Sequence, residues 1–177
     1  GVAARLRGFG PRVLAADPFL PDDVVRARGA EPVALDDLFR RADVITLHAP
    51  GGQRLVDAER LADMRPGTVL VNTARGDLID EASVARALHD GILACYAADT
   101  LAGDTAAHDS PLLAPELADR VIVTPHLGAQ TTQAVDNMGS LSLADVIAVL
   151  SGAEPAHPVP NASIPVPVPV PIPEETR

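Results

Sequence analysis

Lysine is absent from the sequence, and its absence excludes several kinds of site. All 14 permanently charged basic residues among the 177 are arginines, so neither a Schiff-base lysine nor a P-loop lysine is available. The formal net charge is −10. A nucleic-acid surface needs clustered basic residues, so binding to nucleic acid is not expected.

Cysteine and long apolar runs are equally scarce. The single Cys95 lies in an apolar run without a partner, which excludes a disulfide framework and a cysteine metal site; no other metal site is expected. No apolar stretch reaches the roughly 20 residues that span a bilayer. The N-terminus shows no signal-peptide pattern. These absences predict a cytoplasmic chain in a reducing compartment, without a membrane segment.

What the chain does have is enough apolar sequence for one core. Hydrophobic residues make up 47% of the 177 positions, which suits one domain of ordinary size followed by a tail. We expect one domain over 1–129, a return helix over 130–152 and a proline-rich tail over 153–177.

Short apolar runs alternate with helical periodicity through the first 129 residues. Helices are predicted over 2–9, 22–28, 35–41, 58–64 and 81–90. Strands are predicted over 12–16, 32–33, 43–47, 68–71, 93–98 and 121–124. Asp80 is placed to cap the last of these helices and Gly91 to end it. This rhythm with short connections predicts an α/β fold with a doubly wound parallel sheet of Rossmann type.

The last stretch has a different pattern. A long helix is predicted over 130–150, with apolar residues on one face and an end at Ser151-Gly152. Proline alternates with aliphatic residues from Pro165 to Pro173, which predicts an extended polyproline segment without a core. A ligand for an aromatic groove is one interpretation. A disordered terminus is favoured, because the alternation produces PxxP spacing trivially.

Polar residues follow the predicted strands at their carboxyl ends. In open α/β sheets, ligands bind outside these ends. The sequence therefore predicts one crevice that is lined by the residues at these positions. They are Asp17, His48, Arg75, Asp99 and His126.

Three of these residues suggest specific chemistry. Arg75 offers a planar fork that can grip a carboxylate and polarise an adjacent carbonyl. His126, between Thr124-Pro125 and Leu127-Gly128, can exchange a proton near neutral pH. Asp17 can accept hydrogen bonds from ribose hydroxyls and would repel a 2′-phosphate, but Asp17-Pro18 equally suits a simple turn.

The other histidines have weaker contexts. His89 lies on a predicted helix, and His108 and His157 lie in predicted loops, so all three are interpreted as solvated surface residues. His48 is intermediate, because it directly follows a predicted strand but has no further signal around it.

Taken together, these segments resemble the D-isomer-specific 2-hydroxyacid dehydrogenases, a family that includes phosphoglycerate, glycerate and D-lactate dehydrogenases. The likeness runs in order from the first residue to Pro158. It rests on Val13-Leu14-Ala15-Ala16-Asp17-Pro18, Asp43-Val44-Ile45-Thr46-Leu47-His48-Ala49-Pro50, Val71-Asn72-Thr73-Ala74-Arg75-Gly76, Ala98-Asp99-Thr100 and Thr124-Pro125-His126-Leu127-Gly128-Ala129.

The resemblance implies that residues 1–129 are a partial NAD-binding domain of Rossmann type. It also implies hydride transfer between NAD(H) and a small D-2-hydroxy acid or 2-oxo acid. Arg75 would bind the substrate carboxylate and polarise the C2 carbonyl, and His126 would exchange the hydroxyl proton. Asp17 would hold the adenosine ribose and Asp99 the carboxamide. The resemblance implies these cofactor-binding residues: Asp17, Pro18, Ala49, Pro50, Thr73, Ala74, Asp99, Leu127 and Gly128.

One catalytic position departs from the family pattern. The family's glutamate, which hydrogen-bonds the catalytic histidine, corresponds to Asp104, and Thr105 replaces the proline that follows. Asp104 is one methylene shorter than glutamate. The resemblance therefore implies that Asp104 orients His126 through a weaker or water-bridged contact.

The family's glycine-rich phosphate loop and first strand have no counterpart in the sequence, and neither does its mostly N-terminal substrate domain. Without the loop the pyrophosphate loses its main anchor, so the isolated chain is expected to bind NAD poorly and to be inactive. The full-length form is expected to be a homodimer. Two alternatives stay open: an NAD-sensing, co-repressor-like interaction protein, and a truncated gene product without function.

Overall fold

The structure is a computed structural model that describes residues 1–103 and 109–158. The chain divides into two compact units, Gly1–Gly128 and Ala129–Arg177, and each is considered by itself. The predicted division into 1–129, 130–152 and 153–177 remains a prediction. The proline alternation lies outside the described residues.

The first unit begins with a small parallel pair of strands. Gly10 follows the opening helical turns with a φ of +74°, in the left-handed region that suits glycine. The elements of this segment are α1 (Val2–Leu6), a 3-10 turn (Arg7–Phe9), β1 (Leu14–Ala15), α2 (Asp22–Ala27) and β2 (Glu31–Pro32). Among the strands that the structure describes, β1 pairs only with β2, in parallel.

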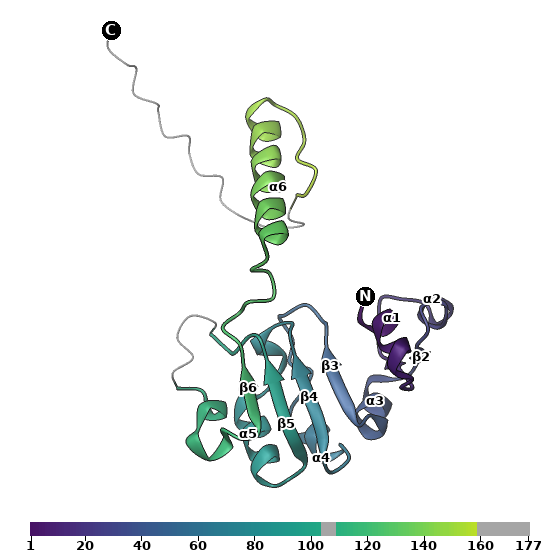
Figure 1. Ribbon diagram of the computed structural model, residues 1–177. Helices are drawn as coiled ribbons and strands as arrows, with labels where there is room; N and C mark the ends of the chain where they lie inside the picture. Colours follow the sequence, from purple (N-terminus) through teal and green to yellow (C-terminus); the bar gives the residue numbers. More distant parts are fainter. Residues whose placement is uncertain (104–108, 159–177) are drawn as a thin grey trace. The chain divides into compact units, whose positions relative to one another are not determined.

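The rest of this unit is a four-stranded parallel sheet with the order β3-β4-β5-β6 (Figure 1). Its elements are α3 (Leu35–Arg41), β3 (Val44–Leu47), α4 (Ala58–Ala62), β4 (Thr68–Asn72), a 3-10 turn (Gly76–Leu78), α5 (Glu81–His89), β5 (Leu93–Ala98), two further 3-10 turns (Pro111–Leu113 and Pro115–Leu117) and β6 (Val121–Val123). The predicted helices and strands are confirmed, with ends that differ by at most about two residues.

Local capping explains where several helices begin and end. The Asp80 carboxylate accepts a hydrogen bond from the Ser83 amide at 3.0 Å and so caps α5, as predicted. Gly91, just beyond α5, has a φ of +76°. Asp57 caps α4 in the same way, through the Arg60 amide at 3.0 Å.

The described strands form two separate sheets, ordered β1-β2 and β3-β4-β5-β6. The usual doubly wound strand order is 3-2-1-4-5-6. The pair and the longer run match this order on either side of its strand 1. The predicted fold class, a Rossmann-type parallel sheet, is confirmed.

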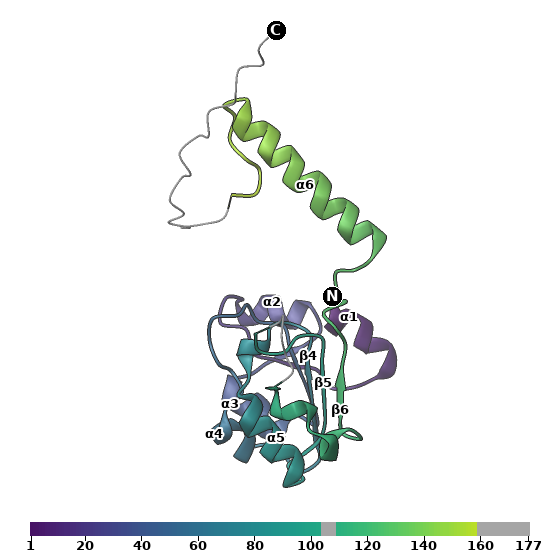
Figure 2. The ribbon, with the colours of Figure 1, turned by 90° about the vertical axis from the view of Figure 1, so that its left-hand side faces the viewer.

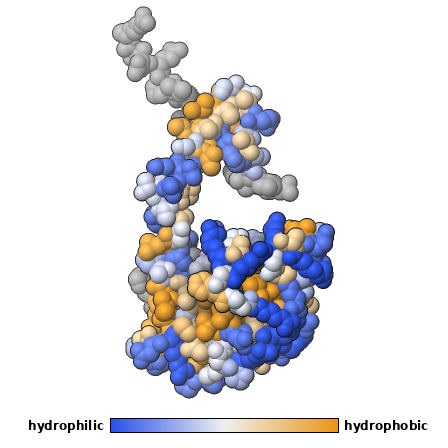
Figure 3. Space-filling model, turned by 45° about the vertical axis from the view of Figure 1, so that its right-hand side comes forward, coloured by the Kyte–Doolittle hydropathy of each residue, from blue (hydrophilic) through white to orange (hydrophobic). Residues whose placement is uncertain are grey.

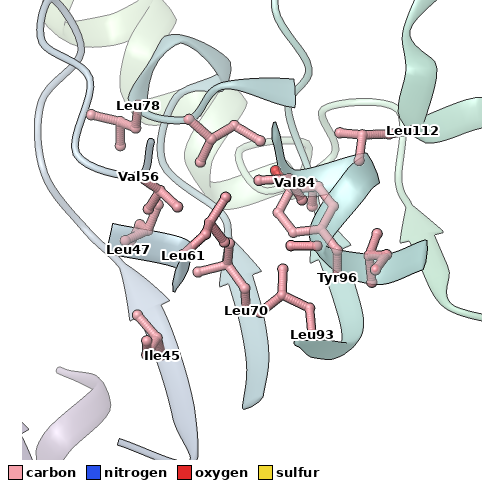
Figure 4. Packing of buried hydrophobic residues seen from close by; sticks show 14 of the residues in the cluster. Ile45, Leu47, Val56, Leu61, Leu70, Leu78, Val84, Leu93, Tyr96 and Leu112 are labelled. Carbon is pink, nitrogen blue, oxygen red and sulfur yellow. The ribbon is translucent and has the colours of Figure 1, made fainter. Parts of the chain in front are cut away.

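All helices that pack on the larger sheet cover the same face. Right-handed crossovers from β3 to β4 and from β4 to β5 place α4 and α5 on one side, and Figure 2 shows α3 there too. The buried side chains of these helices meet alternate residues of the strands (Figure 4). They include Phe39, Ile45, Leu47, Leu61, Leu70, Val84, Leu88, Leu93 and Tyr96.

The opposite face of this sheet is open within the unit. Val44 and Ile122, on its two edge strands, are each 62% exposed. The strand register places Val69 beside Val44, Cys95 beside Val69, and Ala97 beside Ile122. Figure 3 shows apolar side chains gathered on the visible side of this unit. Within this unit, helices therefore pack on one face of the larger sheet only. The loops that carry the site described below follow the strands of this sheet.

The second unit contains α6 (Thr132–Leu150), the predicted long C-terminal helix. The Thr131 hydroxyl accepts a hydrogen bond from the Ala134 amide at 3.1 Å, which caps its first turn. Asp145 accepts from the Ala156 amide at 2.8 Å and lies 3.1 Å from Nδ1 of His157, so the segment after the helix folds back along it. Within the described ranges, no helix has the length and apolarity needed to cross a membrane.

Candidate active site

The predicted site residues follow the carboxyl ends of the strands. His48, Ala49 and Pro50 follow β3, and Arg75 lies in the turn after β4. Asp99 follows β5, and His126 comes shortly after β6. Because the carboxyl ends of parallel strands lie at the same edge of a sheet, these residues all lie at that edge of the larger sheet.

Arg75 is presented by a turn that a buried asparagine holds. The side chain of Asn72, fully buried at the end of β4, donates to the Arg75 carbonyl at 2.8 Å and accepts from the Ala74 amide at 3.1 Å. The Arg75 guanidinium is exposed, and its Nη1 donates to the Ala74 carbonyl at 2.7 Å. The nitrogen and the oxygen of the Asn72 side chain therefore both bond the backbone of the turn from which the Arg75 guanidinium projects.

The loop after β5 packs tightly on this turn. A Cβ added to Gly76 would lie 2.3 Å from the Leu101 carbonyl carbon and 2.5 Å from the Ala102 amide nitrogen. Contacts this short leave no room for any side chain. Glycine after Arg75 is therefore required so that the two loops can approach each other.

The loop after β3 also reaches the arginine turn. The Gly52 amide donates to Oδ2 of Asp77 at 2.6 Å. A Cβ on Gly51 would lie 3.3 Å from the Arg75 Cγ. The segment that follows Ala49 and Pro50 is thereby brought against the residues that follow β4. The loop that contains Ala49 and Pro50 therefore contacts the turn that follows Thr73 and Ala74.

His126 has an unusual backbone. Its φ of +53° is the only positive value at a non-glycine residue within 1–103 and 109–158. This left-handed region is uncommon for side-chain-bearing residues, although histidine enters it more readily than most. The imidazole belongs to an exposed residue at the sheet edge.

Asp99 is tied to the same loop. Its carboxylate accepts hydrogen bonds from the Thr124 hydroxyl, from the Leu127 amide at 2.8 Å and from the Gly128 amide at 2.8 Å. These donors, the Thr124 hydroxyl first, hold the pKa of Asp99 below its ordinary value of 3.8, against the opposing effect of burial. The nearby His126 also lowers the pKa of Asp99. Asp99 therefore stays ionised at neutral pH.

Asp17 and Pro18 follow β1, which belongs to the smaller sheet. They are therefore not at the end of a strand of the larger sheet, unlike the residues above. The Phe19 amide donates to Oδ1 of Asp17 at 2.9 Å, which closes the Asx turn that the sequence left as an alternative. Thr73 is exposed next to the Arg75 turn, and Nε2 of His48 lies 3.1 Å from the Thr46 hydroxyl. Asp104 lies outside the described residues.

Three residues with clear positioning contacts were not predicted as site residues: Asn72, Asp77 and Thr124. Asn72 carried a usable signal, because an asparagine two residues before an amide in a tight turn often accepts from it. The other two depend on contacts between separate loops, which spacing along the chain does not reveal. The described residues hold no group of three or more His, Cys, Asp or Glu arranged for a metal ion.

Comparisons with known proteins agree with this geometry. The family model for the NAD binding domain of D-isomer specific 2-hydroxyacid dehydrogenases matches residues 1–128. A D-3-phosphoglycerate dehydrogenase from Mycobacterium bovis is 42% identical over 154 residues, which are 85% of this chain and 28% of that protein. One from Methanocaldococcus jannaschii is 36% identical over 155 residues, 85% of this chain and 29% of the relative. The chain thus spans less than a third of these relatives.

Solved structures give the same answer. The D-lactate dehydrogenase of Aquifex aeolicus, in complex with NAD and lactic acid, superposes with a TM-score of 0.78 at 29% identity, over 85% of this chain and 50% of that chain. The D-lactate dehydrogenase of Lactobacillus jensenii with NAD+ gives 0.76 at 31% identity, over 89% and 51%. This chain belongs to the D-isomer specific 2-hydroxyacid dehydrogenase family, and residues 1–128 are its NAD binding domain.

Proposed function

We propose that this chain supplies the NAD-binding part of an NAD-dependent D-2-hydroxyacid dehydrogenase. One observation carries the proposal. Arg75 and His126 follow β4 and β6, the two strands that flank β5, and Asp99 at the end of β5 is bonded to the loop of His126. This arrangement supports the proposal that Arg75 binds a carboxylate and His126 exchanges a proton, on either side of the Asp99 carboxylate.

The side chains present fit the nicotinamide end of the cofactor. A carboxylate has about four lone-pair sites, and the described donors to Asp99 are the Thr124 hydroxyl and the Leu127 and Gly128 amides. Asp99 can therefore accept a further hydrogen bond from a carboxamide. Asp17 would accept from ribose hydroxyls through its exposed carboxylate and disfavour a 2′-phosphate, which selects NAD over NADP.

The reacting groups have distinct tasks. Bound NAD(H) would supply or accept the hydride. The Arg75 guanidinium would bind the substrate carboxylate in a bidentate manner and polarise the neighbouring carbonyl. His126 would donate a proton to the carbonyl oxygen during reduction and remove it during oxidation. We propose Asp104 as the carboxylate that orients His126.

The substrate is proposed as a class: a small acid with a hydroxyl or oxo group at C2. The names of the relatives point to different members of this class, 3-phosphoglycerate for some and lactic acid for another. The common element is the carboxylate next to the reacting carbon, which Arg75 suits. A homodimeric full-length form and a cytoplasmic location are part of the same proposal.

A titration and an activity assay test the proposal. The chain is titrated with NADH and with NADPH, and then assayed for NADH oxidation with glyoxylate, hydroxypyruvate and pyruvate. We expect weak binding that favours NADH. For catalysis, residues 1–128 replace the matching part of the Lactobacillus jensenii enzyme, which provides a complete dehydrogenase around these residues.

Matched variants assign the activity of that chimera. His126→Gln should lower kcat by about 100- to 10,000-fold, because proton transfer is lost. His89→Gln serves as the control, since His89 is exposed at the end of α5. Arg75→Lys should raise KM, whereas Arg65→Lys should not, because Arg65 pairs with Asp43 at the opposite ends of the strands. A folded chimera that reduces none of the three acids would refute the proposal.

A further inference from the structure

Asp99 bonds the loop that carries His126 at three points, and the Thr124 amide adds a bond to the Ala98 carbonyl at 2.9 Å. Oδ1 of Asp99 accepts from the Thr124 hydroxyl and from the Leu127 amide, and Oδ2 accepts from the Gly128 amide. These donors lie on both sides of His126 in the sequence. The two oxygens of one carboxylate therefore hold both ends of a short segment.

We propose that Asp99 is a positioning residue for the backbone of His126, and that its carboxylate fixes residues 124–128 in the conformation that presents the imidazole. The inference rests on the proposed function only for the role of His126 in proton transfer. It adds a second task to Asp99, beside the proposed contact with the carboxamide. The bonds of the clamp join residues of this chain to one another.

The backbone of His126 shows why a clamp is needed. A φ of +53° is disfavoured for a residue with a Cβ, and such conformations persist where the surroundings hold them. The His126 amide donates to the Thr124 carbonyl at 2.9 Å, which closes a tight turn before the left-handed residue. The amides of the next two residues are then directed at Asp99, and ionised acceptors make the strongest bonds of this kind.

Gly128 shows how closely the loop approaches the carboxylate. A Cβ at this position would lie 2.9 Å from Oδ2 of Asp99, nearer than ordinary van der Waals contact. Gly128 is not among the glycines with positive φ, so space and not backbone conformation requires glycine here. The same short approach allows its amide to bond the carboxylate.

Asp99 is itself well anchored. It is 8% exposed, and its own amide donates to the Asn72 carbonyl at 3.1 Å. Because Asn72 also holds the Arg75 turn, the position of the carboxylate is fixed by the strand that presents the arginine. A rigid acceptor of this kind can determine the geometry of the loop that binds to it.

Amide exchange by NMR on the 177-residue chain, without cofactor or substrate, tests the clamp. In Asp99→Asn the side chain offers one oxygen and one NH2 group, so one of the two loop amides must face a donor. We expect exchange at Leu127 or Gly128 to accelerate by about 10- to 100-fold, the range for losing a bond to a charged group. The Cα and Hα resonances of His126, which report its backbone conformation, should move toward extended values.

Two further variants separate the clamp from general stability. Gly128→Ala should give the same His126 signature, because its Cβ pushes against Oδ2 of Asp99. Gly8→Ala is its control, since no atom lies within 4 Å of the added Cβ. Asp43→Asn is the control for Asp99→Asn, because Asp43 is an exposed acid paired with Arg65.

Two results would overturn the inference. In the first, the His126 resonances and the loop amides stay unchanged in both Asp99→Asn and Gly128→Ala. In the second, exchange accelerates equally in the loop and in β4 and β5, which would make Asp99 a support of the whole sheet. Neither result depends on hydride transfer, so an inactive chimera would refute the proposed function and leave the clamp standing.

Discussion

Replacing Gly76 by alanine should have two effects: it should destabilise the first unit, and it should displace the Arg75 turn. The added Cβ would lie 2.3 Å from the Leu101 carbonyl carbon, 2.4 Å from its oxygen and 2.5 Å from the Ala102 nitrogen. Ordinary contact begins at 3.4 Å, so the loop after β5 must move by 3.4 − 2.3 = 1.1 Å. All three atoms are backbone, and rotation of a side chain cannot relieve the overlap.

The expected cost is about 2–3 kcal/mol, the upper part of the range for inserting a methyl group into packed structure. Urea denaturation measures it. With a slope of about 1–3 kcal/mol per molar urea, the midpoint should fall by roughly 0.7–3 M. Gly8→Ala, where the Cβ meets nothing, is the matched control. A loss below about 0.5 kcal/mol, within the range of ordinary surface substitutions, would refute the steric argument.

Three further predictions follow from burial, charge and loop contacts. Leu70→Ala, at a fully buried core position, should cost about 2–5 kcal/mol in the same urea assay, whereas Ile122→Thr on the open face should change stability by less than about 0.5 kcal/mol. Because the pKa of Asp99 is lowered, the stability that it contributes is present above its ordinary value of 3.8 and is lost as pH falls through the lower folded value. Amide exchange in residues 124–128 should therefore stay slow down to about pH 4 and accelerate below it; acceleration between pH 7 and 5 would contradict this. Asp77→Ala should weaken NADH binding by about threefold to tenfold, because the loop after Pro50 loses its charged acceptor; an unchanged affinity would exclude that loop from the cofactor site.

The sequence predicted the elements well because each has a local cause. Asp80 and Gly91 mark the ends of α5 through capping and left-handed geometry, both of which depend on neighbouring residues only. β5 is a short apolar run between two turn signals. The separation of β1-β2 from β3-β4-β5-β6 was not predicted, although it agrees with the usual doubly wound strand order.

Contacts between loops were beyond the sequence for a physical reason. Asp99 lies 25 positions before Thr124, and Gly52 lies 25 before Asp77. Each pair meets only because its two residues follow neighbouring strands. Spacing along the chain placed these residues at strand ends, and the choice of hydrogen-bond partner there depends on strand register and on the shape of each turn. A one-residue change in register would redirect each of these bonds.

The hydrogen bonds at the sheet edge connect the two proposed reacting groups. The Asn72 side chain donates to the Arg75 carbonyl, and the Asn72 carbonyl accepts from the Asp99 amide. The Asp99 carboxylate then accepts from the Leu127 amide next to His126. This path crosses β4, β5 and β6 through backbone and buried side-chain groups. The relative placement of the arginine and histidine backbones is therefore set by neighbouring strands of a packed sheet, so that two exposed residues on separate loops keep a defined separation.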